Sequence, residues 1–398
     1  MDLSYSREEI AFREEVRDFF RTAVPADTRS RLIEGRELGK DDIVNWQRIL
    51  NKKGWAVPHW PKRWGGTGWD AVKLHIFNEE MQLAPAPQPL PFNVNMLGPV
   101  LYNVGSEEQQ NYYLPRLANL DLWFCQGFSE PGAGSDLASL KTRAERSGEV
   151  YLVNGQKTWT TLAQYADMMF CLVRTDLHAK NRQSGISFLL IDMKSRGITV
   201  RPIQTIDGGM EVNEVFFDNV EVPVANRVGE ENKGWDYAKF LLGNERTGIA
   251  RIGASKERLR RIRELASQQI SEGRPLIEDD RFLEKLTAIE IELKALEMNQ
   301  MRVVAAEKHR DKSKPDPASS ILKIKGSELQ QATTELMLEV LGPFAAAYAP
   351  VADDDRSNEL EEWTMHIASN YFNYRKVSIY GGSNEIQRNI IAKAVLGL

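Results

Sequence analysis

The sequence has few cysteines and histidines and lacks a long hydrophobic run. Its 398 residues include two cysteines, Cys125 and Cys171, and five histidines that lie far apart. Two cysteines in a chain of this size indicate reduced, buried thiols, so we expect a cytoplasmic protein. The histidines show no ligand spacing, and we expect no metal site. The apolar stretch at 186–193 is far too short to cross a bilayer, so we expect no membrane insertion.

The sequence also lacks an excess of either charge. Lys and Arg number 51, Asp and Glu number 56, and the formal net charge is −5. A nucleic-acid-binding protein needs a strong basic bias, so we expect no nucleic-acid partner. The N-terminus is charged from residue 2 and has none of the apolar core of a secretory signal. The length is sufficient for a large core and for more than one domain.

Three blocks of different hydrophobic pattern divide the chain. Residues 1–120 and 235–398 have helical periodicity, whereas residues 121–234 contain short β-rich runs separated by Gly, Asp and Asn. We therefore expect an α+β, multi-domain fold with one domain for each block. The order is an N-terminal helical domain, a middle antiparallel β barrel or sandwich, and a C-terminal antiparallel helical bundle.

Local signals place some of the elements within these blocks. Ser6 with Glu9 forms a capping box ahead of an amphipathic helix. Asn154-Gly155 lies between alternating residues and predicts a β-hairpin at that point. The helices expected in the third block cover 235–271, 280–310, 318–340 and 358–378, with a short helix after Gly382.

A glycine-rich loop lies at residues 125–136, with the sequence CQGFSEPGAGSD. Glycine has no Cβ, so the backbone N–H groups of such a loop can approach a phosphate closely. The loop is not a dinucleotide fingerprint, because that motif requires glycine at position 137 and this chain has Leu137. On this stretch alone, a phosphate cradle and a tight interdomain turn are equally good interpretations.

Four motifs together resemble the acyl-CoA dehydrogenase family, in their order and spacing. They are FSEPGAGSD (128–136), NGQKTWTT (154–161), VNEVFFDNVEVP (212–223) and GGSNEIQRNII (381–391). The similarity covers essentially the whole chain and is greatest to the large subunits of bacterial two-subunit enzymes for pimeloyl-CoA or steroid thioesters. It implies FAD as cofactor, an acyl-CoA substrate, an electron-transfer flavoprotein as electron acceptor, and a second acyl-CoA dehydrogenase-like subunit in a heterotetramer.

The resemblance assigns cofactor contacts to particular positions. Ser129, with the backbone of Phe128, would bind the pyrimidine edge of the flavin, and Ser135 would meet the pyrophosphate. Trp159 would lie beside the isoalloxazine and Thr161 would donate toward flavin N5, roles that suit a flat apolar group and a placed donor. Without the resemblance, both would be interpreted as ordinary strand residues. The implied cofactor-binding residues are Phe128, Ser129, Gly134, Ser135, Trp159, Thr161, Ser383 and Glu385.

The resemblance also requires a catalytic carboxylate in a water-poor cleft, where its pKa rises toward the working pH. Many members place this glutamate directly after the tyrosine of the C-terminal turn, where this chain has Gly381. A minority place it on a bundle helix beside an arginine, and the segment 241–251, LLGNERTGIAR, offers Glu245 and Arg246. We expect Glu245 to be the base and the Gly381 N–H to bind the thioester carbonyl. Tyr380 would contact substrate, and Arg246 would either contact substrate or orient the glutamate. A solvent-facing Glu-Arg pair is the alternative.

The expected reaction is α,β-dehydrogenation of an acyl-CoA to the trans-2-enoyl-CoA, with an acyl-CoA oxidase as an alternative. Homotetrameric members lend FAD contacts to a neighbouring subunit through two segments that this chain has changed, at 269–274 and 339–345. In the second, Glu339 and Pro343 oppose anion binding. These changes predict a second subunit that supplies the contacts, or a catalytically silent scaffold chain. The acyl group stays open among long-chain, dicarboxylic and steroid acids.

Overall fold

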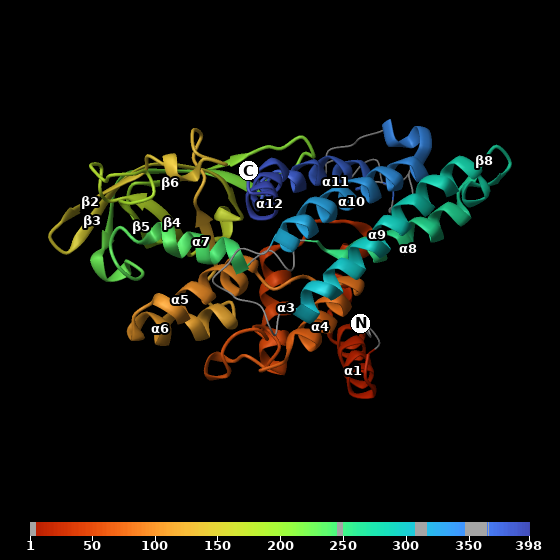
Figure 1. Ribbon diagram of the computed structural model, residues 1–398, viewed down its shortest axis with the longest axis horizontal. Helices are drawn as coiled ribbons and strands as arrows, with labels where there is room; N and C mark the ends of the chain where they lie inside the picture. The colour runs from red at the N-terminus through yellow and green to blue at the C-terminus, as the bar shows by residue number, and fades with distance from the viewer. Residues whose placement is uncertain (1–4, 245–249, 307–316, 347–363, 365) are drawn as a thin grey trace.

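The computed structural model describes residues 5–244, 250–306, 317–346, 364 and 366–398. In Figure 1 the large β sheet lies on the left, the C-terminal helices extend to the right, and the N-terminal helices lie below them. A helical part, a β part and a second helical part follow one another along the chain, so the expected fold class is confirmed.

Amphipathic helices build the N-terminal part of the chain. The expected capping box is confirmed, because the Ser6 hydroxyl accepts the Glu9 N–H and the Glu9 carboxylate accepts the Ser6 N–H. The apolar helix faces meet around Phe20, Trp46 and Phe77, which are all buried. The helices are α1 (Arg7–Ala23), α2 (Ala26–Glu34), α3 (Lys40–Lys53), α4 (Ala71–Leu83), α5 (Gly98–Val104) and α6 (Glu107–Ala118), with a π-helical turn η2 (Phe92–Leu97) before α5.

A seven-stranded sheet forms the middle part, in the order β1-β4-β2-β3-β7-β6, and β5 pairs with β4. Most pairs are antiparallel, as expected, but β1 runs parallel to β4. The β2–β3 hairpin lies between these two strands in the sequence and supplies the long crossover that a parallel pair needs. The strands are β1 (Phe124–Gly127), β2 (Arg143–Ser147), β3 (Val150–Thr161), β4 (Met168–Arg174), β5 (Ile186–Asp192), β6 (Ile198–Ile203) and β7 (Val212–Pro223).

The hairpin predicted at Asn154-Gly155 is wrong, because both residues lie inside the long strand β3. The actual β2–β3 turn contains Gly148, whose φ is 62°. Gly155 instead has φ 148° at an irregularity of the β3–β7 register, and a Cβ there would come within 2.7 Å of the Thr142 Cα. The glycine therefore permits a bulge in β3 and lets the backbone near Thr142 pass close to it.

Both cysteines are free and fully buried in the sheet core. Burial raises the pKa of Cys171 to about 12 and raises that of Cys125 still further. A thiol with so high a pKa stays protonated at neutral pH and is a poor nucleophile. The two cysteines are thus packing residues.

The third part is a helical bundle with its own core around Leu259, Leu286 and Leu329. The helix expected over 235–271 is two described helices, separated by residues that the structure does not describe, and the β8–β9 hairpin follows them. Within the described ranges, no helix is both long and apolar enough to cross a membrane. The elements are α7 (Gly234–Asn244), α8 (Ile252–Gln268), β8 (Ile270–Ser271), β9 (Arg274–Pro275), α9 (Asp280–Ala306), α10 (Pro317–Leu341), α11 (Ile367–Asn373) and α12 (Asn384–Ile391).

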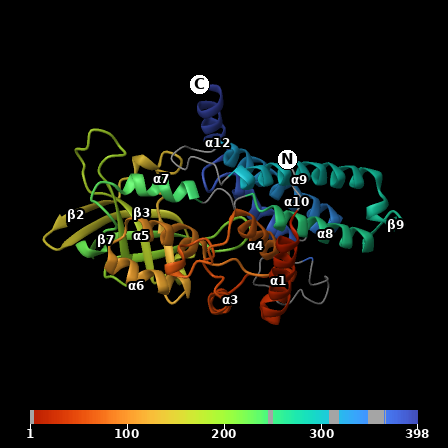
Figure 2. The same cartoon turned by 60° about the horizontal axis from the view of Figure 1, so that its bottom comes forward.

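Figure 2 shows α4 beside the bundle. A partly buried network of ion pairs joins the two. Glu79 on α4 accepts from Arg13 of α1 at 2.8 Å and from Lys256 of α8 at 2.6 Å, and Lys256 also contacts Glu297 of α9. Burial alone would raise the pKa of the Glu79 carboxyl, but the two cations lower it to about 2. The charged network therefore holds the N-terminal helices against the bundle.

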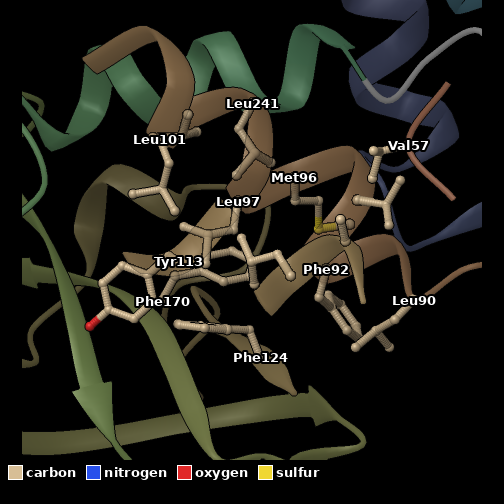
Figure 3. Close-up of a cluster of buried hydrophobic side chains, with 14 of the residues drawn as sticks. Val57, Leu90, Phe92, Met96, Leu97, Leu101, Tyr113, Phe124, Phe170 and Leu241 are labelled. Atoms are coloured by element: carbon tan, nitrogen blue, oxygen red, sulfur yellow. The ribbon is translucent and has the colours of Figure 1, made fainter. Parts of the chain in front are cut away.

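A single apolar cluster also connects the N-terminal helices to the sheet and to α7. Figure 3 shows Leu97 and Leu101 close to Phe124 of β1, Phe170 of β4 and Leu241 of α7. All five are fully buried. Buried apolar area of this kind, drawn from three parts of the chain, fixes where the end of α7 lies relative to the sheet.

Candidate functional site

The glycine-rich loop begins where β1 ends. Phe128 is buried, and its ring packs edge-on against the Phe170 ring at 5.7 Å between centroids. The Ser129 carbonyl accepts the Thr158 N–H of β3 at 2.9 Å. Glu130 and Ala133 then exchange both backbone hydrogen bonds at 3.0 Å, which closes a tight turn. The loop is therefore fixed to the sheet on its inner side.

The outer side of this loop is open. A Cβ built on Gly132 or Gly134 would meet no heavy atom within 4 Å, and neither residue has a positive φ. Neither packing nor backbone conformation thus requires glycine at these two positions. Ser135, which follows, is exposed. An open stretch of backbone N–H groups of this kind suits the approach of an anionic ligand.

Trp159 is the most unusual residue on β3. It lies in a register irregularity between Lys157 and Thr160, it has a left-handed φ of 56°, and it is 60% exposed. A left-handed conformation costs a residue with a Cβ about 1–2 kcal/mol, and the exposed indole adds no burial in return. Such strain concentrates at binding sites. Thr161 follows it and is half-buried.

Two buried polar atoms near Trp159 have no hydrogen-bond partner among the described residues: Thr160 Oγ1 and Asn213 Oδ1. Asn213, on β7, donates its amide to the Thr160 carbonyl at 3.1 Å and to Gln164 at 2.7 Å. Buried polar groups are nearly always satisfied, so these two atoms call for a water or a ligand atom. Neither residue was predicted from the sequence, because neither residue type stands out within a strand.

A strongly basic hollow of about 390 Å³ lies beside the same loop. Arg182 on its rim pairs with Asp136 at 3.0 Å, and Arg174 donates to the carbonyls of Ala138 and Arg182. The hollow's chemistry suits phosphate groups. Its lining is Leu140, Lys141, Arg174, Asp176, Leu177, Ala179, Lys180, Asn181 and Arg182.

The C-terminal turn holds the other group of predicted site residues, and it is treated as the second side of the candidate site. Tyr380 is exposed, and Gly381 and Gly382 both have left-handed φ values, 65° and 82°, that glycine adopts without strain. Ser383 caps α12 by accepting the Ile386 N–H. Glu385 is exposed in the first turn of α12, where hydrogen bonds from its own N–H and from Ser383 lower its pKa. The turn is thus also an ordinary helix start.

A buried polar cluster on α10 lies under this turn. Lys323, which is fully buried, donates to Asn384 Oδ1 at 2.8 Å, and Ser327 also donates to that oxygen. Gln387 donates to the Gly382 carbonyl at 3.4 Å and accepts from Ser320 at 2.8 Å. Burial lowers the pKa of Lys323 to about 8. The cluster fixes the start of α12 to the bundle.

A chain of contacts joins the two sides of the site. The Leu162 N–H, directly after Thr161, donates to the Glu211 carbonyl at 2.7 Å. The Glu211 carboxylate pairs with Lys376, and the Lys376 carbonyl accepts the Tyr380 N–H at 3.2 Å. The strand end and the C-terminal turn are thereby linked through three residues.

Several sequence-predicted residues are thus placed, and two are not. Phe128, Ser129, Trp159 and Thr161 come together at the edge of the sheet, while Gly381, Ser383 and their neighbours form the turn. Glu245 and Arg246 lie outside the residues that the structure describes. In the described part of the chain, no group of three or more His, Cys, Asp or Glu side chains is arranged to hold a metal ion.

The residues at the sheet edge fit a planar ligand that carries phosphates. An exposed indole offers a flat apolar surface, Ser129 and Thr161 offer hydroxyl groups, and the glycine loop leaves room for a close backbone approach. A Cβ at Gly132 or Gly134 would project into the open space that the ligand would occupy. These features match the flavin and the pyrophosphate of FAD.

Comparison with known proteins agrees with this fold. Three family models match in order: "Acyl-CoA dehydrogenase, N-terminal domain" over residues 6–121, "middle domain" over 125–220 and "C-terminal domain" over 232–396. The curated Acyl-CoA dehydrogenase FadE26 of Mycobacterium tuberculosis (strain ATCC 25618 / H37Rv) is 33% identical over 405 residues, which cover 100% of this chain and 99% of that protein.

Two solved complexes contain chains with the same fold. A chain of the ChsE4-ChsE5 complex from Mycobacterium tuberculosis superposes with a TM-score of 0.84 at 33% identity, covering 100% of this chain and 99% of that one. A chain of the Tcur3481-Tcur3483 steroid ACAD gives a TM-score of 0.85 at 30% identity with the same coverage. The predicted similarity to enzymes of the two-subunit type is confirmed.

The chain belongs to the acyl-CoA dehydrogenase family, whose members are flavin-dependent oxidoreductases. The class of reaction is therefore FAD-dependent dehydrogenation of an acyl-CoA. The glycine-rich loop and Trp159 both lie within residues 125–220, the range that the middle-domain model matches.

Proposed function

We propose that this chain converts an acyl-CoA thioester to the trans-2-enoyl-CoA, with Glu245 as the base that removes the α-proton. Bound FAD would accept the hydride from Cβ. The observation that carries the cofactor assignment is Trp159, strained and exposed at the edge of the sheet beside the open glycine loop. The cofactor would contact Phe128, Ser129, Gly134, Ser135, Trp159, Thr161, Ser383 and Glu385.

Two observations support Glu245 as the base. The described residues that flank its segment, Leu241 and Ala250, are both buried, and Ala250 packs closely on Gly326 of α10. A general base of this kind needs a water-poor setting that raises its pKa toward the working range, and buried flanking residues favour such a setting. The turn position that carries the glutamate in many relatives is Gly381, which has no side chain to compete for the same volume.

The turn has a second proposed role at the thioester carbonyl. Negative charge grows on that oxygen as the α-proton leaves, and a backbone N–H held in place stabilises it. Gly381 supplies such a donor on an exposed turn that the Gln387 and Asn384 contacts hold to the bundle. Tyr380 and Arg246 would contact the substrate beside it.

The basic hollow at Lys141, Lys180 and Arg182 supports an acyl-CoA as the substrate. Its Arg182 pairs with Asp136, at the end of the glycine loop, and its cations suit the phosphates of coenzyme A. The similarity to a complex described as a steroid ACAD favours a bulky acyl group, with steroid thioesters ahead of long-chain and dicarboxylic acids.

We also propose a heterotetramer with a second acyl-CoA dehydrogenase-like subunit, which supplies the FAD contacts that this chain has lost, and an electron-transfer flavoprotein as acceptor. The similar structures that are complexes of two different chains support it. Glu339, at one changed position, pairs with Lys285 at 2.8 Å within this chain. Large apolar side chains lie exposed near the C-terminus, at Ile379, Val395, Leu396 and Leu398.

Two further parts of the proposal concern the chain as a whole. We place the domain limits at 1–120, 121–234 and 235–398, since β1 begins at Phe124 and α7 at Gly234. Two free, buried cysteines support a cytoplasmic location.

The decisive experiment is Glu245→Gln in the complex purified with its genomic neighbour. Loss of the base should slow the anaerobic bleaching of bound flavin by acyl-CoA by a factor of about 100 to 10,000, while flavin content stays the same. Glu257→Gln, a surface glutamate of α8 that pairs with Arg260, is the matched control and should bleach at the normal rate. Unchanged bleaching in the Glu245 variant would instead favour a scaffold chain, and rapid peroxide formation in air would favour an oxidase.

A further inference from the structure

A buried ion pair lies behind the glycine-rich loop. Lys157 of β3 is 0% exposed and Glu130 of the loop is 8% exposed, with 2.8 Å between Nζ and Oε1. Removing two charges from water is costly, and the cost is offset only where the charges are paired and their remaining hydrogen bonds are made. Both groups meet this condition through further contacts with the backbone.

The Glu130 carboxylate receives two backbone donors besides the lysine. The Lys141 N–H donates to Oε2 at 2.6 Å and the Thr142 N–H donates to Oε1 at 2.9 Å. Burial alone would raise the pKa of this carboxyl, but the Lys157 charge and these hydrogen bonds lower it. The carboxylate stays ionised, and it joins the loop to the segment ahead of β2.

The Lys157 ammonium makes a second contact, to the Phe128 carbonyl at 3.1 Å. It therefore holds the loop at two points, one on each side of Ser129. Ser129 itself is joined to β3 through the Thr158 N–H. Ser129 thus lies between the two residues that this ammonium contacts, and Trp159 lies two residues along β3 from Lys157 itself.

Apolar packing fixes only part of the loop. Phe128 and Ala133 are buried, but Gly132, Gly134 and Ser135 are exposed, and the two glycines contact nothing on their outer side. Apolar side chains over these exposed positions would fix them but would also cover the surface that a ligand needs. An ion pair attached from behind fixes the backbone and leaves that surface free.

We propose that Glu130 and Lys157 are positioning residues of the cofactor site: they hold the 128–135 loop and the Trp159 bulge at their binding separation before the cofactor arrives. The inference rests on the proposed flavin site. It goes beyond that site by assigning its preorganisation to a pair of residues that do not touch the cofactor.

The test must separate positioning from stability, since removing one partner of a buried pair destabilises the fold. The informative protein is the double variant Glu130→Gln/Lys157→Met, because it removes both charges and so leaves neither charge buried without its partner. We expect its thermal midpoint without cofactor to lie closer to the wild type than that of either single variant. Its FAD dissociation constant should still rise by about ten-fold to a hundred-fold, the range for losing hydrogen bonds to a charged group.

A second measurement needs no cofactor at all. Amide hydrogen exchange at Ser129–Ser135 should be faster in the double variant without FAD, while exchange in β5 and α10 stays the same. Lys256→Met is the control: it removes a half-buried cation from the bundle, so it should lower the thermal midpoint yet leave FAD affinity and loop exchange unchanged. All proteins are the full chain, measured alone and as the co-purified complex.

The outcomes separate the two proposals. Unchanged FAD affinity in a folded double variant overturns the positioning role, even if loop exchange is faster. Unchanged loop exchange with weaker FAD binding also overturns it, since the loop would then be ordered without the pair. A wild-type chain and complex that take up no FAD overturn the proposed function, and the positioning role with it.

Discussion

Each side of the candidate site contains a fully buried lysine, and the two lysines have different partners. On the sheet side, Lys157 meets the Glu130 carboxylate and the Phe128 carbonyl. On the side of the C-terminal turn, Lys323 donates to the amide oxygen of Asn384, and the carboxylate whose charge acts on it, Glu385, is exposed. The buried lysine thus has a charged partner on the sheet side and a neutral partner on the side of the turn.

The difference between the partners of the two lysines indicates which side of the site is preformed. A charge matched by a buried carboxylate is stabilised in place, whereas a buried charge matched by a neutral amide is penalised. The cation also lies at the start of α12, where the helix dipole disfavours positive charge. We infer that the sheet side is held by a matched pair of charges and that the attachment of the turn depends on the protonation of Lys323.

The test with the largest expected effect replaces each of the two lysines by methionine. Lys157→Met leaves the Glu130 carboxylate buried without its cation, and we expect a loss of about 3–5 kcal/mol in the free energy of unfolding. Lys323→Met removes a charge that has no buried carboxylate and leaves Asn384 paired with Ser327, so its loss should be below about 1 kcal/mol. Urea unfolding of the chain at neutral pH measures both. Equal losses would contradict the comparison.

The second test follows the pH dependence of stability. The pKa of Lys323 is about 8 in the folded chain, against an ordinary value of 10.5. Between these values the unfolded chain binds the proton that the folded chain releases, so stability rises with pH, by at most about 1.4 kcal/mol per pH unit. The Lys323→Met variant should lack this rise. Parallel curves of unfolding free energy against pH for the two proteins would refute the assignment.

The smallest expected effect concerns a glycine on the sheet side. Gly134→Ala should change the free energy of unfolding by less than about 0.5 kcal/mol, because its Cβ meets nothing, yet it should weaken FAD binding by entering the ligand's room. Gly155→Ala is the contrasting control. Its φ of 148° and the nearby Thr142 predict a loss of about 1–3 kcal/mol. Equal FAD affinity in the wild type and in Gly134→Ala would contradict the proposal that the loop contacts the cofactor.

The misplaced hairpin shows why local signals fail inside a sheet. Asn154-Gly155 is a strong turn dipeptide, but turn formation competes with a strand that pairs β2 on one side and β7 on the other. The long-range pairing prevailed, and the glycine became part of a bulge. Residues far away in the sequence decided this outcome, so no short window could have predicted it.

The ion pair escaped prediction for a different reason. Glutamate and lysine are seldom fully buried, so both residue types are assigned to the surface by default when only the sequence is known. Glu130 and Lys157 are separated by 27 positions, and only the pairing of the loop with β3 brings them together. Lys323 escaped prediction in the same way, since lysine on an amphipathic helix is normally exposed.

The sequence by itself determined the helix–sheet–helix order, the helix start at Ser6 and the glycine-rich loop, because each depends on periodicity, capping or backbone freedom within a few residues. The tertiary structure alone decided the strain and exposure of Trp159, the burial of Lys157 and Lys323, and their unequal partners. Burial and pairing are properties of three-dimensional neighbours, and a change of one residue in strand register would have turned Lys157 to the opposite face of the sheet.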